Sequence, residues 1–248
     1  MTWRRCGRCW AGLYNKKLPA NVALGIRLKN VEKETGRALT EDEAKAILRM
    51  ASAVRWSGRG REGMALARRW VPWLMAYSGA RVGEVAQLRK EDVELVREGD
   101  GEHWTYSIMR EAGTVKGGKE RRVPVHPHLV ELGFIEMVKA APSGHLFITP
   151  NREASDPRKA VLGPLKGVTN RLAAATRAVV PDKTVDPNHG WRHRFTALSY
   201  EHNVSDDLSR VIMGHSGKDV HAKVYGLKGK GAGLYREMCK LPSVKLDA

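Results

Sequence analysis

The sequence predicts a mainly α-helical protein with one small three-stranded antiparallel sheet. Two observations support this fold class. Apolar residues recur at helical spacing over most of the chain, in segments that glycine, proline and asparagine separate. Between residues 92 and 126 the period changes, and three short β-rich runs alternate with turn-forming residues. A mainly helical domain that includes one small sheet accounts for both patterns.

The first 38 residues differ from the rest of the chain. Apolar residues fall at helical spacing over residues 1–16 with nothing beside them to pack on, and the charged stretch that follows is typical of a linker. Thr40 then predicts a helix start, because its hydroxyl can accept a hydrogen bond from the amide three residues on. We therefore place the main domain at residues 39–228.

Helical segments make up most of this domain. Residues 62–77 carry an apolar face with Pro72 as a potential kink, and a Ser-Gly pair ends the segment. The next segment, RVGEVAQL at residues 81–88, has a buried stripe of valine and leucine. Beyond the β-rich region we expect helices over residues 127–140, 163–178, 189–202, 205–213 and 219–226.

The three β-rich runs read DVELV, HWTYSIM and RRVPV, and the turn segments EGDGE and KGGKE separate them. This order predicts an antiparallel meander. The last segment, residues 229–248, is expected to be a flexible basic tail with one short helix at LYREMCKL. The apolar side of that helix would pack on a second copy of the chain or on its own domain.

Composition restricts the partner and the location. A net charge of +16 and a pI near 10.0 favour a polyanion, above all a nucleic acid. The sequence has neither an apolar run long enough to span a bilayer nor the apolar core of a secretory signal, so we expect a cytoplasmic protein without membrane contact. Cys6 and Cys9 form a lone CxxC, which we interpret as free thiols rather than a zinc site.

Five short motifs distribute cationic side chains and a tyrosine along the chain. They are Arg81 in SGARVGE, Lys116 in TVKGGKERRVPV, His189 and Arg192 in HGWRHRF, His215 in MGHS, and Tyr225 in KVYG. A metal-free attack on a phosphodiester needs these residue types, because cations must hold the anionic phosphate while a hydroxyl displaces its neighbour. The ordered set, rather than any single motif, carries this prediction.

Arg81 opens its predicted helix beside the positive end of the helix dipole. That position is favourable if an anion binds there, and Glu84, one turn on, could orient the guanidinium. Taken alone, Arg81 would be interpreted as a surface cation paired with Glu84. Lys116 lies in the tight turn before the third strand, where it could protonate a leaving oxygen. Lys119 is its rival for that role.

His189 and Arg192 are three residues apart and therefore share one face of a helix. His189 and His193 also have the spacing of a zinc-binding pair, but the glutamate of the HExxH motif is absent, so we do not expect a metal. His215 interrupts a helix and could donate to a non-bridging phosphate oxygen. Tyr225 is the expected nucleophile, and Tyr235 is the alternative.

The ordered motifs resemble those of the tyrosine recombinase (phage integrase) family over roughly residues 36–228. This resemblance implies the catalytic-domain fold of that family. It also implies a DNA recombinase that breaks and rejoins strands through a 3′-phosphotyrosine, with no metal or nucleotide cofactor. Tyr225 would be the nucleophile, Arg81 and Arg192 would clamp the phosphate, and Lys116 would be the general acid. His189 and His215 would assist, and Glu84 would support Arg81.

Integrases of this family carry a separate helical core-binding domain before the catalytic one. By this comparison residues 1–38 resemble a remnant of its last helix and the linker, which predicts an N-terminally truncated integrase with weak, salt-dependent binding to double-stranded DNA. Self-association as a tetramer on DNA is also implied. Two alternatives stay open: a non-catalytic DNA-binding relict of an integrase, and a basic RNA-binding protein of unrelated fold.

Overall fold

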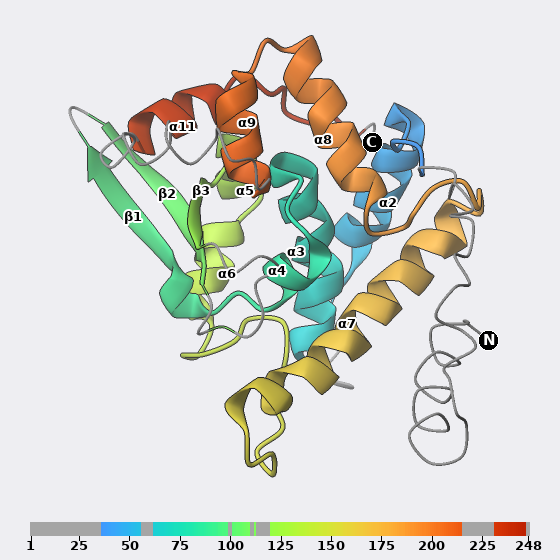
Figure 1. The fold of residues 1–248 in the computed structure, drawn as a ribbon, viewed down its shortest axis with the longest axis vertical. Helices are drawn as coiled ribbons and strands as arrows, with labels where there is room; N and C mark the ends of the chain where they lie inside the picture. The colour runs from blue at the N-terminus through green and yellow to red at the C-terminus, as the bar shows by residue number, and fades with distance from the viewer. Residues whose placement is uncertain are drawn as a thin grey trace, which may run out of the picture. The chain divides into compact units, whose positions relative to one another are not determined.

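The computed structural model describes residues 36–55, 62–98, 101–109, 112, 120–214 and 231–246, which belong to one compact unit that begins at Gly36. Helices dominate this part of the chain, as predicted. In chain order (Figure 1), the elements are α2 (Glu41–Ala53), α3 (Glu62–Ser78), α4 (Val82–Ala86), the short 3-10 helix η1 (Lys90–Asp92), β1 (Val93–Glu98), β2 (Gly101–Ile108), β3 (Arg121–Pro124), α5 (Pro127–Glu131), α6 (Phe134–Ala140), α7 (Pro157–Val179), α8 (Gly190–Glu201), α9 (Asp206–Met213) and α11 (Gly231–Met238).

The three strands form the predicted antiparallel meander, in the order β1-β2-β3. Val93 pairs with Tyr106 across the first two strands, and Ile108 pairs with Arg121 across the second two. The sheet packs on the core through three buried side chains, Tyr106, Ile108 and Val123. Helices α9 and α11 both pack on β3, which is an edge strand of the sheet. This edge therefore lies against the C-terminal part of the domain (Figure 1).

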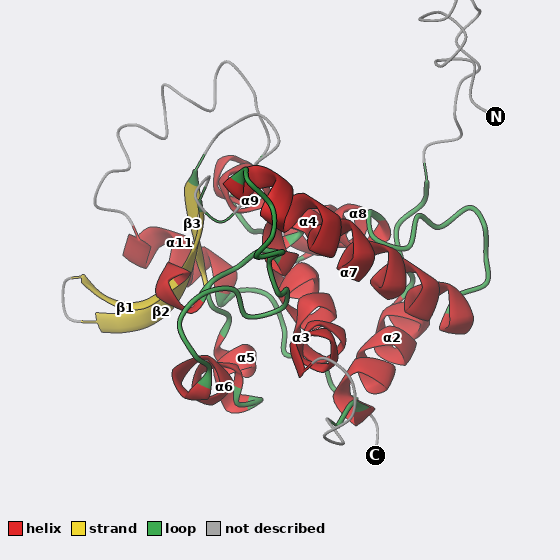
Figure 2. Cartoon of the chain, turned by 90° about the horizontal axis from the view of Figure 1, so that it is seen from below, coloured by secondary structure: helices red, strands yellow, loops and turns green. Residues whose placement is uncertain are grey.

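Helix α3 is the centre of the helical part. It packs on α2, α4, α7 and α8, and its residues from Trp70 to Met75 are buried. The helix continues through Pro72. Trp191 on α8 is 1 % exposed and belongs to the same core. Seen from below, the strands lie at one side and α2, α3, α7 and α8 lie together at the other (Figure 2).

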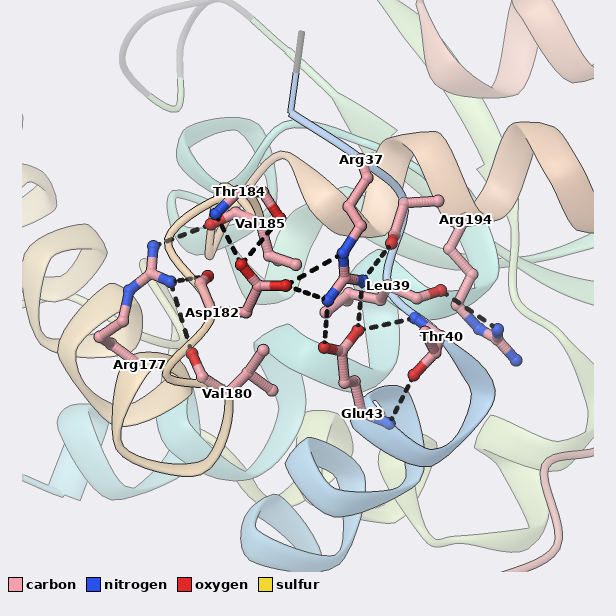
Figure 3. A network of polar contacts seen from close by, with 11 residues as sticks. Arg37, Leu39, Thr40, Glu43, Arg177, Val180, Asp182, Thr184, Val185 and Arg194 are labelled. Atoms are coloured by element: carbon pink, nitrogen blue, oxygen red, sulfur yellow. Dashed lines mark hydrogen bonds and ion pairs between the residues drawn. The ribbon is translucent and has the colours of Figure 1, made fainter. Parts of the chain in front are cut away.

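An arginine network holds residues 36–40 on the domain (Figure 3). The Arg37 guanidinium donates two hydrogen bonds to Glu43, of 2.6 and 2.7 Å, and another of 2.6 Å to Asp182 in the connection between α7 and α8. Thr40 accepts from the Glu43 amide, and Glu43 accepts from the Thr40 amide, so the predicted helix start at Thr40 is confirmed as a capping box. Arg177 donates to backbone carbonyls of the same connection.

The helices predicted over residues 127–140 and 163–178 have different bounds in the structure. The helix expected over residues 127–140 is divided into α5 and α6, because Gly133 between them adopts a left-handed backbone with φ of 87°. Helix α7 begins six residues before the expected position, at Pro157. Its start carries a clear sequence signal: Asp156 accepts a hydrogen bond from the Arg158 amide, and proline occupies the first helical position.

Helix α11 packs on its own domain. It begins at Gly231 rather than Leu234, and the Glu98 carboxylate accepts a hydrogen bond of 3.0 Å from the Ala232 amide. The following segment lies against α3 and α5: His126 Nε2 donates to the Leu241 carbonyl at 2.9 Å, and the Val244 amide donates to the Tyr77 hydroxyl at 3.0 Å. The helices expected over residues 1–16 and 219–226 lie outside the described residues.

Candidate phosphate-binding site

Arg81 lies at the junction of α3 and α4. Its backbone is extended, with φ of −70° and ψ of 141°, and its carbonyl accepts hydrogen bonds from the amides of Glu84 and Val85. Helix α4 has five residues and is shorter than the segment 81–88 that the sequence predicted. A dipole that short adds little positive potential. The positive charge of this region therefore comes mainly from arginine side chains.

Glu84 is buried between two of these arginines. One carboxylate oxygen lies 3.0 Å from Arg81 Nη1, and the other lies 2.6 Å from Arg121 Nη2. The Glu84 side chain is 3 % exposed. Burial by itself would raise the pKa of Glu84, but the Arg121 guanidinium and the hydrogen bonds from Arg81 outweigh it and hold that pKa below its ordinary value. Glu84 is therefore ionised at neutral pH.

Arg192 comes from α8 and is 5 % exposed. Its Nη1 donates to the carbonyls of Gly79 and Met213, at 2.8 and 2.7 Å. Burial lowers the pKa of Arg192 most strongly, and the positive charges of Arg81 and Arg121 lower it further. The negative charge of Glu84 opposes them, and the resulting pKa is about 10. The guanidinium stays charged at neutral pH. Arg121 shares the Met213 carbonyl with Arg192 and the Glu84 carboxylate with Arg81, so the three arginines lie in one region.

His189 precedes the first residue of α8. The Asp186 carboxylate accepts a hydrogen bond of 2.8 Å from its amide, which fixes the start of the helix. Burial and the positive charges of His193, Arg192 and Arg81 lower the pKa of His189, and Asp186 opposes them. A neutral imidazole at pH 7 can accept a proton from a reacting hydroxyl.

His193, the partner in the alternative zinc pair, lies edge-on to His189 with ring centroids 4.9 Å apart. No cluster of three histidine, cysteine, aspartate or glutamate side chains able to hold a metal ion occurs in the described part of the chain. Likewise, no described helix is both long and apolar enough to cross a membrane.

The structure thus brings together four of the residues singled out from the sequence: Arg81, Glu84, His189 and Arg192. Lys116, its rival Lys119, His215 and Tyr225 lie outside the described residues. Tyr235, the alternative nucleophile, lies on α11, where its ring stacks on His103 at a centroid distance of 4.7 Å. Burial raises the pKa of Tyr235, which disfavours the phenolate form.

Sequence reasoning missed Arg121. This residue starts β3, and its guanidinium contacts Glu84 and the end of α9. A signal was present, because the KxxKxR phrase that begins at Lys116 ends with Arg121, at the start of the third strand. The surplus of guanidinium groups over the single carboxylate at Glu84 makes this region electropositive, which suits an anion such as a phosphate.

No protein-family model matches the sequence, and no curated protein matches it. Solved structures do match. An integrase from mycobacterium phage Brujita is 18 % identical, with a TM-score of 0.50 over 97 % of this chain and 77 % of that one. The site-specific recombinase XerH in its post-cleavage complex with palindromic difH is 19 % identical, with a TM-score of 0.50 over 83 % of this chain and 56 % of that one. The pre-cleavage XerH complex gives 20 % identity and a TM-score of 0.49, over 82 % and 53 %.

This chain therefore spans little more than half the length of XerH. At these identities the likeness shows the fold alone: the chain has the tyrosine recombinase catalytic-domain fold, mainly helical with a small antiparallel sheet. The fold class expected from the sequence is confirmed.

Proposed function

We propose that this chain is a site-specific DNA recombinase or integrase that cleaves and rejoins DNA through a 3′-phosphotyrosine. The observation that supports this function best is the arrangement of Arg81, Arg121 and Arg192 around the buried Glu84, with His189 beside them. Fixed guanidinium groups stabilise the charge that develops on a phosphate during displacement. The fold, shared with an integrase and a recombinase, agrees with this chemistry.

In the proposed reaction the Tyr225 hydroxyl attacks the scissile phosphorus. The bond to the 5′ oxygen breaks, and the DNA 3′ end becomes joined to the tyrosine. Arg81 and Arg192 hold the phosphate oxygens, while neutral His189 accepts the tyrosine proton. Lys116 gives a proton to the leaving oxygen, which leaves as a 5′-hydroxyl. Attack by a 5′-hydroxyl on the phosphotyrosine reverses these steps and rejoins the strand. His215 would donate to a non-bridging oxygen.

The proposed partner is double-stranded DNA in the cytoplasm. Helix α7, which packs on α4, exposes four basic side chains that can contact the phosphate backbone: Arg158, Lys159, Lys166 and Arg171. These contacts predict binding that weakens steeply with salt. Self-association as a tetramer on DNA is part of the proposal, and sedimentation of the protein with and without a duplex measures it.

The decisive experiment uses a DNA whose 5′-bridging oxygen at the cleaved bond is replaced by sulfur. Because the target sequence is unknown, the probe is a pool of such duplexes with randomised flanks. We expect a covalent protein–DNA adduct with the unaltered chain, none with Tyr225→Phe, and retention of the adduct with Tyr235→Phe.

The same probe tests the general acid. A thiolate leaves without protonation, so Lys116→Ala should form the adduct on the sulfur-substituted pool but not on the all-oxygen pool. Failure of the unaltered chain to form an adduct, while it still binds duplex, would refute catalysis and support the non-catalytic DNA-binding alternative.

A further inference from the structure

Arg121 joins three parts of the site that are distant in sequence. It begins β3, and its side chain is 8 % exposed. Nη2 forms a 2.6 Å ion pair with Glu84, which belongs to α4. Nε donates to the carbonyl of Ile212 at 2.9 Å, and Nη2 also donates to that of Met213 at 3.3 Å, both at the end of α9. A guanidinium can serve these acceptors together because its donors form a rigid fork.

Both candidate phosphate-binding arginines share an acceptor with Arg121. Arg81 binds one oxygen of the Glu84 carboxylate, and Arg121 binds the other. Arg192 and Arg121 both donate to the Met213 carbonyl, at 2.7 and 3.3 Å. The orientations of the Arg81 and Arg192 guanidinium groups therefore each depend on an acceptor that Arg121 also contacts.

Gly214 indicates that this junction is closely fitted. The residue follows α9 with a left-handed backbone, φ of 71°. A Cβ atom there would lie 2.5 Å from the Arg121 guanidinium. The guanidinium thus occupies the space that any side chain at position 214 would need.

We propose that Arg121 is a positioning residue that holds Arg81, through Glu84, and Arg192, through the Met213 carbonyl, in the arrangement that binds the phosphate. The proposal rests on the function proposed above, because that function identifies the ligand as a DNA phosphate. The role assigned to Arg121 is positioning because its Nε and Nη2 already donate to Ile212, Met213 and Glu84. Fixing charged groups before the substrate arrives avoids the cost of ordering them during the reaction.

A double-mutant cycle in DNA binding tests this without requiring cleavage. The probe is a fluorescein-labelled duplex, and anisotropy gives Kd for Arg81→Ala, Arg121→Met and the double variant. Loss of one arginine–phosphate contact weakens binding by about tenfold. We expect each single variant to weaken binding by about that factor and the double variant to weaken it by less than the product of the two, because only the part of the Arg121 effect that acts through Arg192 remains once Arg81 is gone. If the increase in Kd of the double variant equals the product of the increases in the two single variants, the proposal is overturned.

Arg122 provides the matched control. It follows Arg121 on β3, its side chain is 61 % exposed, and it pairs with Glu94 at 3.0 Å. Arg122→Met removes the same charge from the neighbouring position without touching Glu84. Any increase in Kd caused by Arg122→Met should therefore multiply with the increase caused by Arg81→Ala. This result would show that the assay detects independent contributions.

Single-turnover cleavage separates positioning from a purely structural role. Measured at saturating protein, Arg121→Met should lower the rate constant of adduct formation by about a hundredfold, as loss of an oriented transition-state contact does. A residue that only supports folding would change the amount of adduct and leave the rate constant alone, a result that would refute positioning. Arg122→Met should leave the rate constant unchanged.

Arg121→Lys keeps the experiment informative if Arg121→Met does not fold. Lysine preserves the buried charge opposite Glu84 but lacks the rigid planar fork that reaches the carboxylate and the two carbonyls, so we expect a rate constant between those of the unaltered chain and Arg121→Met. A rate constant equal to that of the unaltered chain would contradict the proposal. Absence of any adduct from the unaltered chain, together with a non-additive binding cycle, would instead refute the proposed cleavage and leave the positioning role standing.

Discussion

Replacing Gly214 with alanine should destabilise the domain for two separable reasons. The first is the backbone: a left-handed conformation with φ of 71° costs an alanine about 1–2 kcal/mol. The second is the collision of the new methyl group with the Arg121 guanidinium, which lies 2.5 Å from the position of Cβ. Arg121 would have to move and weaken its bonds to Ile212 and Met213, and one lost hydrogen bond from a charged donor costs roughly 1.5–3 kcal/mol.

The expected total for Gly214→Ala is therefore about 3–5 kcal/mol in the free energy of unfolding. Gly133→Ala is the matched control, because Gly133 has a φ of 87° and the nearest atom to its Cβ position is a Glu136 oxygen at 3.9 Å. It should cost only the backbone contribution of about 1–2 kcal/mol. Urea unfolding followed by circular dichroism measures both.

The collision can be removed independently of the backbone. In an Arg121→Met background, Gly214→Ala should cost no more than Gly133→Ala, because the guanidinium is gone. Equal losses for Gly214→Ala and Gly133→Ala in the otherwise unaltered chain would refute the reasoning. They would mean that Arg121 moves aside freely and is not held where the structure places it.

Two further predictions concern pH. Burial lowers the pKa of His126, whose Nδ1 accepts from the His128 amide, so the free energy of unfolding should fall as pH drops below about 6.5, the pKa of an unfolded histidine. His126→Gln cannot titrate and should show a smaller slope between pH 7.5 and 5.5 in thermal melts; an unchanged slope would contradict this. The hydrogen bond from Arg37 lowers the pKa of Glu43 to about 2. Stability from this pair is present above the unfolded carboxyl pKa of about 4 and is lost as pH falls toward about 2. Arg37→Met should therefore lower the melting temperature at pH 7 but not near pH 2, and an equal loss at both pH values would exclude the ion pair as its cause.

The sequence predicted well those features that neighbouring residues determine. The capping box at Thr40 and the end of α3 depend on side chains within a few residues of the backbone groups that they satisfy, and the meander pairs strands that follow one another in the chain. The same holds for the ion pair of Arg81 with Glu84, three positions apart. The early start of α7 was readable as well, from the Asp156–Pro157 pair. Local signals of this kind are sufficient because the chemistry that they report is local.

The tertiary structure decided what depends on contacts between distant segments. Arg121 lies 37 positions from Glu84 and 91 from Ile212, and no periodicity or spacing relates such residues. The folded chain brings β3, α4 and α9 together, and the Arg121 guanidinium therefore shares one acceptor with Arg81 and another with Arg192. The sequence by itself determined the fold class and which cationic residues are available for a phosphate. Only packing could decide which cation holds the others in place, because burial and shared acceptors exist only in the folded chain.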